Sequence, residues 1–326
     1  MTGPRILAIR LGAMGDIIHT LPAVASLKHS FPRSKLCWIV EPRWAPLLEG
    51  NPFIDEVIIL ERGSVRGIWE TRKRLRRERF DLAVDFQGLV KSALVATAAW
   101  PEKIVGYHPS EVREKWAALF YSTKVRTQSA HVVDRHLELA AAAGAASLVK
   151  SFPLPEGKPE GRLPEGRFVL ASPLAGWAGK QWPLEYYGRL ARLLQKELDL
   201  PLVLNGPPDS RPVLAEVAGA IPHLSSLPGL IDATRRAAAV VGVDSGPMHL
   251  AAALGKPGVA ILGPTDPARN GPYGGTMKVL RSANARTTYK RRTVIEGSMR
   301  EISPEMVFEA LAGELTSRRS SAGNHL

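Results

Sequence analysis

The chain has 326 residues, of which 45% are hydrophobic and 23% charged, and a formal net charge of +12. This length suits two domains, and the composition is typical of a soluble globular protein. A single cysteine, Cys37, excludes an intrachain disulfide, no signal peptide follows Met1, and no apolar run is long enough to span a bilayer. We therefore expect a cytoplasmic protein, one still able to lie on a membrane surface.

Short apolar runs alternate with helical patterns in the first half of the chain. The predicted strands cover 5–10, 35–40, 57–60, 81–85 and 103–106, and the predicted helices cover 21–30, 69–79, 91–99 and 131–144. This alternation predicts a parallel sheet with crossover helices.

A glycine-bearing loop follows the first strand. Gly12 and Gly15 allow a tight turn with Asp16 beside it, and Pro22 predicts that a regular helix starts near Thr20 or kinks there. The spacing fits equally well a reactive carboxylate or a helix N-cap at Asp16. It is not the dinucleotide pattern Gly-x-Gly-x-x-Gly, so a nicotinamide cofactor is not supported.

A second polar group follows the fourth predicted strand. It consists of Asp85, Gln87 and Lys91, and for Asp85 we favour a capping role. Gly88 permits a turn there.

Half of the net charge lies in residues 62–79. Eight cations stand there against Glu70 and Glu78, namely Arg62, Arg66, Arg72, Lys73, Arg74, Arg76, Arg77 and Arg79. A solvated helix face is one interpretation, but an anionic acceptor or an anionic lipid surface explains the cluster better. Nucleic acid is disfavoured because few aromatic residues lie among the charges.

The segment 153–166 is rich in proline and glycine and predicts a linker. Beyond it the same alternation resumes, with strands at 168–172, 202–205, 240–243, 259–262 and 278–280, and helices at 184–196, 211–220, 231–238 and 247–254. Ser303 and Pro304 open a last helix that reaches Leu315.

The most informative stretch is 242–263. A buried strand leads into Asp244, after which Ser245 and Gly246 open a helix that accepts Pro247 in its first turn. The free amides of such a helix end bind anions such as a diphosphate. A second loop, 263–274, follows the next strand and carries Thr265 and Asp266, the latter open to a capping role. Together the two loops suggest a nucleotide-sugar site.

These motifs make the chain resemble the lipopolysaccharide heptosyltransferases of glycosyltransferase family 9. The resemblance rests on the Asp16 loop, on Asp-Phe-Gln-Gly-Leu-Val-Lys-Ser at 85–92 and on Asp-Ser-Gly-Pro-Met-His at 244–249. Segments 85–92 and 116–121 are most similar to heptosyltransferase I. The resemblance implies an α/β protein of the GT-B fold, with two Rossmann-like doubly wound domains facing each other across a cleft. We expect an acceptor domain at 1–155, a nucleotide-sugar domain at 156–302, and a helix and tail at 303–326 that pack back towards the first domain.

The resemblance also implies an inverting, metal-independent transfer of heptose from ADP-heptose to the Kdo sugar of Kdo-lipid A, at the cytoplasmic face of the inner membrane. Asp16 matches the general base, Lys180 the lysine that contacts the donor phosphates, and Asp244 the carboxylate that faces the donor sugar. The other implied donor-site residues are Gly176, Asp209, Ser245, Gly246 and His249. The implied acceptor-site residues are Arg62, Arg66, Arg72, Lys73, Arg74, Arg113 and Gln87.

Two features keep alternatives open. Ala175 and Gly176 stand where relatives often have hydroxyl residues, which leaves the contacts with the donor phosphates to backbone amides or to Lys180. Asp209 is equally well interpreted as a helix N-cap.

Transfer onto a core heptose, as by heptosyltransferases II and III, is the second expectation for the function. A nucleotide-sugar epimerase is the third, and an inactive binding protein is disfavoured by the presence of Asp16, Lys180 and Asp244 together.

Overall fold

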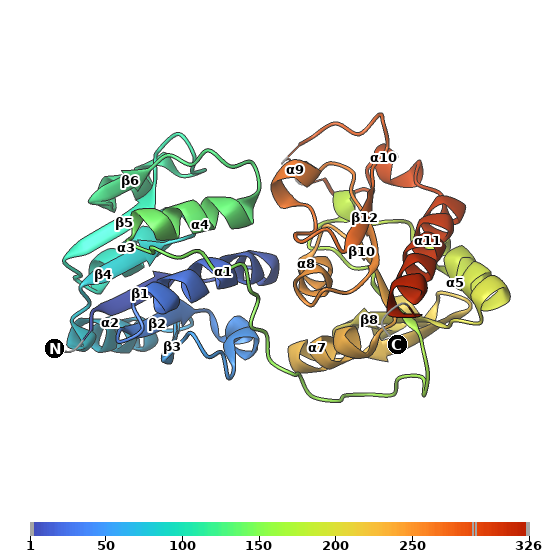
Figure 1. Cartoon of the computed structure of the whole chain (residues 1–326), viewed down its shortest axis with the longest axis horizontal. Helices are drawn as coiled ribbons and strands as arrows, with labels where there is room; N and C mark the ends of the chain where they lie inside the picture. Colours follow the sequence, from blue (N-terminus) through green and yellow to red (C-terminus); the bar gives the residue numbers. More distant parts are fainter. Residues whose placement is uncertain (1–2, 289, 291, 324–326) are drawn as a thin grey trace. The chain divides into compact units, whose positions relative to one another are not determined.

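The computed structural model describes residues 3–288, 290 and 292–323, without the side chains of 317–323. The chain divides into two compact units, Met1–Pro155 and Glu156–Leu326 (Figure 1).

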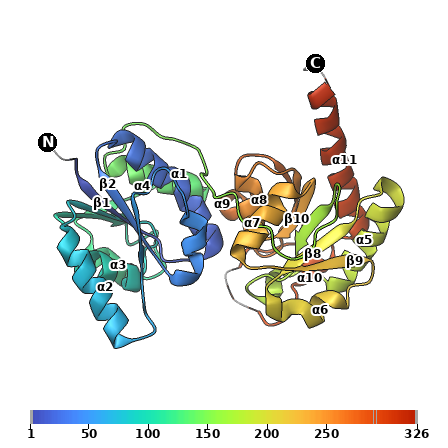
Figure 2. The ribbon, with the colours of Figure 1, turned by 90° about the horizontal axis from the view of Figure 1, so that it is seen from below.

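The described residues of the first unit form one six-stranded parallel sheet in the order β3-β2-β1-β4-β5-β6. Its strands are β1 (Arg5–Ile9), β2 (Lys35–Val40), β3 (Glu56–Ile59), β4 (Leu82–Asp85), β5 (Lys103–Tyr107) and β6 (Thr123–Val125). Its helices are α1 (Met14–Ser30), α2 (Val65–Glu78), α3 (Val90–Ala98) and α4 (Val132–Ala142), with 3₁₀ turns η1 (Pro42–Leu48) and η2 (Lys115–Phe120). Figure 2 shows α1 and α4 on one face of the sheet and α2 and α3 on the other.

The second unit repeats this plan, with its described strands in the order β12-β11-β10-β7-β8-β9. They are β7 (Val169–Ser172), β8 (Leu202–Gly206), β9 (Ala220–Leu224), β10 (Ala239–Val243), β11 (Gly258–Ile261) and β12 (Met277–Leu280). The helices are α5 (Leu184–Leu198), α6 (Arg211–Ala215), α7 (Leu227–Arg236), α8 (Gly246–Ala253), α9 (Pro267–Asn270), α10 (Gly297–Arg300) and α11 (Pro304–Gly323), with 3₁₀ turns η3 (Ala178–Lys180) and η4 (Pro208–Ser210).

Both units are therefore doubly wound, as predicted, and both have a point where the strand order reverses. It lies between β1 and β4 in the first unit and between β7 and β10 in the second. In open parallel sheets, ligands bind at this point, beyond the carboxyl ends of the strands.

The helix after β1 differs from the prediction. We expected a start near Thr20 or a kink at Pro22, but α1 begins at Met14 and runs through Pro22 to Ser30. Residues 17–27 are all buried. Because helices in proteins are stabilised mainly by such packing, burial outweighs the loss of one backbone hydrogen bond at proline.

Two edge strands were not predicted, β6 and β9. The predicted helix 211–220 ends at Ala215, and β9 begins at Ala220. Both strands are short and largely exposed, and β9 contains Pro222, which sheets tolerate at an edge. They therefore lack the continuous apolar run that marks a buried strand.

The last helix packs within the second unit. Val307, Ala310, Leu311 and Leu315 of α11 join the core formed by α5 and the strands of the second sheet. The apolar stripe of the described part of α11 is used there because it completes one face of that sheet. Within the described residues, no helix combines the length and the apolar character needed to cross a bilayer.

Candidate active site

Asp16 lies in the first turn of α1, where the sheet of the first unit reverses its order. The N-cap position is Ala13, so Asp16 is not the N-cap; its Oδ2 instead accepts the backbone N–H of Ala13 at 3.2 Å. The same oxygen pairs with Nη2 of Arg10 at 2.6 Å, and 43% of the Asp16 side chain is exposed. The carboxylate is thus oriented by two donors and still reachable from solvent.

Arg10 is the residue that ties this carboxylate to the sheet. It is buried, and its Nη1 donates to the carbonyl of Phe86 at 2.6 Å while Nη2 holds Asp16. One guanidinium therefore spans the ends of β1 and β4. Gly12 completes the loop, because a Cβ there would lie 2.7 Å from Nε1 of Trp44.

Asp85 has a structural role, but it is not the helix cap that we favoured, because the N-cap of α3 is Leu89. It is fully buried and accepts hydrogen bonds from the hydroxyls of Tyr121 (2.6 Å) and Ser92 (2.8 Å) and from the backbone N–H of Gln87 (2.9 Å). Burial raises the pKa of its carboxyl, and these hydrogen bonds oppose that rise. Gly88, at φ +68°, makes the turn that we predicted.

Gln87 connects the two loops of this edge. Its Oε1 accepts the backbone N–H of Leu11 at 2.9 Å, which fixes the start of the Asp16 loop. Sequence spacing alone did not reveal this contact.

A group of cations surrounds Glu41, at the end of β2. Arg62 lies 2.5 Å from Glu41 Oε1, and Lys91 and Arg43 lie at 3.6 Å from the carboxylate. The Glu41 backbone N–H donates to Leu11 O at 3.1 Å, so this group borders the Asp16 loop.

Two more predicted acceptor residues lie on exposed elements at this edge. Arg113 is in the loop after β5, exposed and 3.6 Å from Glu114. Arg66 is in the first turn of α2 and pairs with Glu70.

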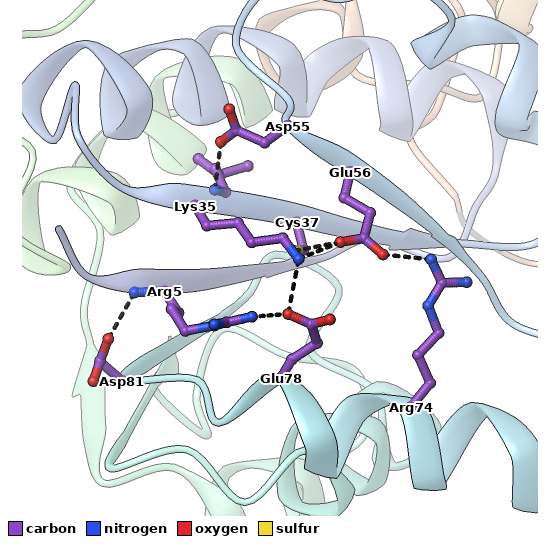
Figure 3. Close-up of polar contacts among 9 residues, drawn as sticks. Arg5, Lys35, Cys37, Asp55, Glu56, Arg74, Glu78 and Asp81 are labelled. Carbon is purple, nitrogen blue, oxygen red and sulfur yellow. Dashed lines mark hydrogen bonds and ion pairs between the residues drawn. The ribbon is translucent and has the colours of Figure 1, made fainter. Parts of the chain in front are cut away.

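Three other predicted acceptor residues, Arg72, Lys73 and Arg74, lie in the second half of α2. Arg74 bonds Glu56, the first residue of β3, at 2.5 Å. Figure 3 shows that pair in a network at the amino ends of the strands, with Lys35 also bonded to Glu56 and Glu78. Arg72 and Lys73 belong to the same half of α2. Because α2 runs from the carboxyl edge towards the amino edge, these cations lie away from Asp16.

The second unit has a buried ionic cluster at its own reversal point. Nζ of Lys180, after β7, contacts Oδ2 of Asp244, after β10, and Oγ1 of Thr265 donates to the same oxygen. His249 Nε2 lies 3.4 Å from Asp244 Oδ1. Burial by itself raises the pKa of the Asp244 carboxyl, but His249 and Lys180 outweigh it and hold that pKa well below its usual value.

The lowered pKa favours the ionised form of Asp244, and this carboxylate holds Lys180 at the strand ends. The Lys180 side chain is about one-fifth exposed, and an ammonium has three donors, so one contact with Asp244 leaves donors for an anion. Thr265 was predicted only as part of a loop; its place in this cluster comes from the adjacency of β10 and β11.

The helix end next to this cluster has the predicted form. Ser245 is the N-cap of α8, Gly246 is its first residue and Pro247 lies in its first turn. The Ser245 hydroxyl donates to Val243 O at 3.2 Å and does not cap the helix. Asp266 caps α9 through the N–H of Ala268 at 3.0 Å.

The remaining predicted donor residues lie on exposed loops at the same edge. Gly176 follows β7 with open space where a Cβ would stand, and Asp209 is exposed in η4, after β8. The N-cap of α6 is Ser210, so Asp209 does not have the capping role that was its alternative. Within the described residues, no group of histidine, cysteine, aspartate and glutamate side chains is suited to hold a metal ion.

Two Rossmann-like units, one with a carboxylate and one with a lysine and a helix N-terminus at its reversal point, define the class of GT-B glycosyltransferases. Comparison with solved structures supports this class. E. coli heptosyltransferase WaaC with ADP matches at TM-score 0.78 and 26% identity, covering 95% of this chain and 99% of that one. E. coli ADP-heptose LPS heptosyltransferase II has the same fold, with a TM-score of 0.78.

The family follows from the sequence. The model of glycosyltransferase family 9 (heptosyltransferase) matches residues 68–299. The chain therefore belongs to glycosyltransferase family 9 and is a glycosyltransferase, which confirms the resemblance.

Curated relatives agree with this assignment. Lipopolysaccharide heptosyltransferase 1 of Pseudomonas aeruginosa is 31% identical over 83% of this chain and 81% of its own length. The Escherichia coli K12 protein of the same name is 30% identical over 85% of this chain and 93% of its own length. Lipopolysaccharide heptosyltransferase 2 of the same strain is 28% identical over 94% of this chain.

Proposed function

We propose that this protein transfers heptose from ADP-heptose to the Kdo sugar of Kdo-lipid A, in the assembly of the lipopolysaccharide inner core. The relatives named lipopolysaccharide heptosyltransferase 1, at 30–31% identity, support this acceptor. The observation that carries the proposal is the pair of reversal-point clusters, Asp16 with Arg10 and Lys180 with Asp244.

On the acceptor side, Asp16 is the proposed general base. Its carboxylate takes the proton of the acceptor hydroxyl as that oxygen forms a bond to the anomeric carbon of heptose. Arg10 and the Ala13 N–H both hold Oδ2, which keeps the carboxylate in one orientation. Attack opposite the leaving ADP inverts the anomeric configuration.

On the donor side, the bond between the anomeric carbon and the diphosphate breaks, and negative charge grows on ADP. Lys180 and the free amides at the start of α8 supply positive charge there. We propose that these groups stabilise that charge in a metal-independent reaction. Gly176, Asp209 and His249 complete the proposed donor site.

For the acceptor's anionic groups we propose the cations at the carboxyl edge of the first sheet. Arg62, Arg66 and Arg113 are exposed there, and Gln87 fixes the loop that carries Asp16. An acceptor that is part of a lipid places the enzyme at the cytoplasmic face of the inner membrane.

The proposed base is tested by Asp16→Asn. We expect kcat to fall by about 10²–10⁴-fold, the usual contribution of general-base catalysis, because the amide cannot take the hydroxyl proton. The affinity for ADP, measured by calorimetry, should stay within about twofold, since the donor contacts lie in the second unit. Asp199→Asn, an exposed carboxylate at the end of α5, is the matched control and should transfer normally. Near-normal turnover of the Asp16 variant would refute the assignment.

A second candidate, transfer onto a core heptose, is favoured by the similarity to lipopolysaccharide heptosyltransferase 2 along 94% of this chain. Parallel assays with Kdo-lipid A and with its heptosylated form separate the two. Sugar product from the donor alone, without an acceptor, would instead indicate an epimerase.

A further inference from the structure

One face of the first unit exposes an unusual number of large apolar side chains. They lie on α2, α3 and η2 or directly after α3, and each is at least half exposed: Val65, Ile68, Trp69, Leu94, Trp100, Trp116 and Leu119. The helices α2 and α3 lie side by side on this face (Figure 2), and η2 packs against α3. Many exposed apolar side chains on adjacent elements mark an interaction site. We call it the α2–α3 face.

This face contains a groove of about 480 Å³. Its walls come from both helices and include Leu75, Leu94, Val95 and Trp100, together with Arg72 and Arg76. The volume is within the range of small-molecule binding sites, and the lining is apolar apart from Thr71, Thr97 and the two guanidinium groups. The groove is thus suited to an apolar chain that carries an anionic group.

Four of the six cations on the exposed part of α2 are available to bind an anion. Arg66 and Arg74 are paired with Glu70 and Glu56. Within the described residues, Arg72, Lys73, Arg76 and Arg77 form no ion pair. Lys73 lies 4.9 Å from the centre of the Trp69 ring, and Arg76 lies 5.3 Å from that of Trp100. Tryptophan beside lysine or arginine is typical of protein surfaces at the level of lipid headgroups.

We propose that the α2–α3 groove binds an acyl chain of an anionic phospholipid in the bilayer, with the lipid phosphate held by Arg72 and Arg76. The face around it is the membrane-docking surface. The inference rests on the proposed location at the inner membrane and not on any step of the transfer reaction.

The positive charge of this face favours an anionic lipid over a second copy of the chain as the binding partner. A two-fold contact would bring the unpaired cations of one face against the same cations of its mate, and like charges oppose such a contact. An anionic bilayer complements both parts of this face, because its phosphates pair with the cations and its acyl chains contact the apolar side chains.

Vesicle binding of the full chain tests the proposal, without donor or sugar acceptor. We expect sedimentation with vesicles that contain phosphatidylglycerol, little with pure phosphatidylcholine, and weaker binding at high salt. Bromine atoms on the acyl chains should quench the tryptophan fluorescence.

Two variants separate the parts of the site. Arg72→Gln with Arg76→Gln should lower vesicle affinity about 25-fold, at about fivefold per cation. Ala98→Phe fills the groove and keeps every charge, so it should reduce bromine quenching while salt-sensitive binding persists. The matched control, Arg192→Gln with Arg211→Gln, removes two exposed cations of the second unit and should bind vesicles like the parent.

Several outcomes would overturn the proposal. One is an equal loss of vesicle affinity in the two double variants. Another is tryptophan quenching that is unchanged in Ala98→Phe. A third is a chain that does not bind vesicles but self-associates, with the self-association abolished by Trp100→Ala. Heptose transfer to a detergent-dispersed acceptor is assayed separately, so a failure of the proposed function is distinguishable from a failure of this site.

Discussion

Each candidate reactive side chain of this protein is held by an opposite charge at the carboxyl ends of the strands. Arg10 holds Asp16 in the first unit, and Asp244 holds Lys180 in the second. Such pairs orient a group without consuming all of its hydrogen-bonding capacity, since a carboxylate has a second oxygen and an ammonium has three donors. At the scale of the residue, the site is therefore prepared before any substrate binds.

Lys180→Ala tests this arrangement. A hydrogen bond from a charged group contributes about 1.5–3 kcal/mol, so we expect the Kd for ADP to rise about 10- to 100-fold. Because the variant also leaves the buried Asp244 without its lysine partner, the Tm should fall. Calorimetry and thermal unfolding measure the two effects. Lys196→Ala, an exposed lysine of α5, should change neither. An unchanged Kd for ADP would remove Lys180 from the donor site.

At the scale of the element, α2 contacts the sheet at its carboxyl end and exposes cations and aromatic side chains on its outer face. Its carboxyl end is bound to the sheet by Lys35, Glu56, Glu78 and Arg74 (Figure 3). Its exposed face carries the unpaired cations and aromatic side chains of the proposed docking surface. The network therefore holds in place the helix that the proposed lipid contact uses.

This network predicts acid sensitivity. Hydrogen bonds from Lys35 lower the pKa of Glu56 and of Glu78 below the ordinary value of 4.5. Groups with a lowered pKa in the folded state stabilise the protein above pH 4.5, and this contribution is lost as the pH falls through the folded pKa. We expect the Tm to fall steeply below that pH, and Lys35→Met to be less stable near pH 7 with a smaller further loss in acid. Parallel slopes of Tm against pH for the two proteins would contradict the assignment.

At the scale of the whole molecule, each unit has a core and a reversal point of its own. The predicted linker is partly packed on the second unit: Glu160 accepts the backbone N–H of Ser226 at 2.6 Å, and the Lys158 N–H donates to Pro228 O at 3.0 Å. The candidate donor-site residues all lie within that unit. Donor binding is therefore a property of a part of the chain that has its own core.

The fragment 156–326 should accordingly fold and bind ADP with an affinity near that of the full chain. A domain of this size buries about 70% of the surface that its unfolded chain exposes, which is enough for independent stability. Without Asp16 it should not transfer heptose. Thermal unfolding and calorimetry with ADP measure the expected properties. A fragment that does not unfold cooperatively would show that the second unit needs the first.

The strands at the centre of both sheets were predictable because they are buried on both faces. Residues 82–84 and 240–243 are continuous apolar runs that are each followed by an aspartate, and β4 and β10 lie within a residue of the predicted bounds 81–85 and 240–243. The edge strands β6 and β9 have no such run. The predicted start of α1 was also wrong. The sequence shows the proline that weakens a helix at position 22, but it does not show that the surrounding residues are buried and that their packing compensates for it.

The sequence by itself determined the alternation of strands and helices, the glycine-bearing loop before Asp16, the helix that opens at Ser245, and the family, because these depend on local residue patterns. Only the tertiary structure decided which charges meet. Arg10 contacts Phe86, Thr265 contacts Asp244 and Glu41 pairs with Arg62, and the partners in each of these contacts are far apart in the sequence. Arg74 pairs with Glu56 in the same way. The physical reason is that a parallel sheet brings together the ends of strands separated by a whole crossover helix, and ion pairs depend on that distance in space.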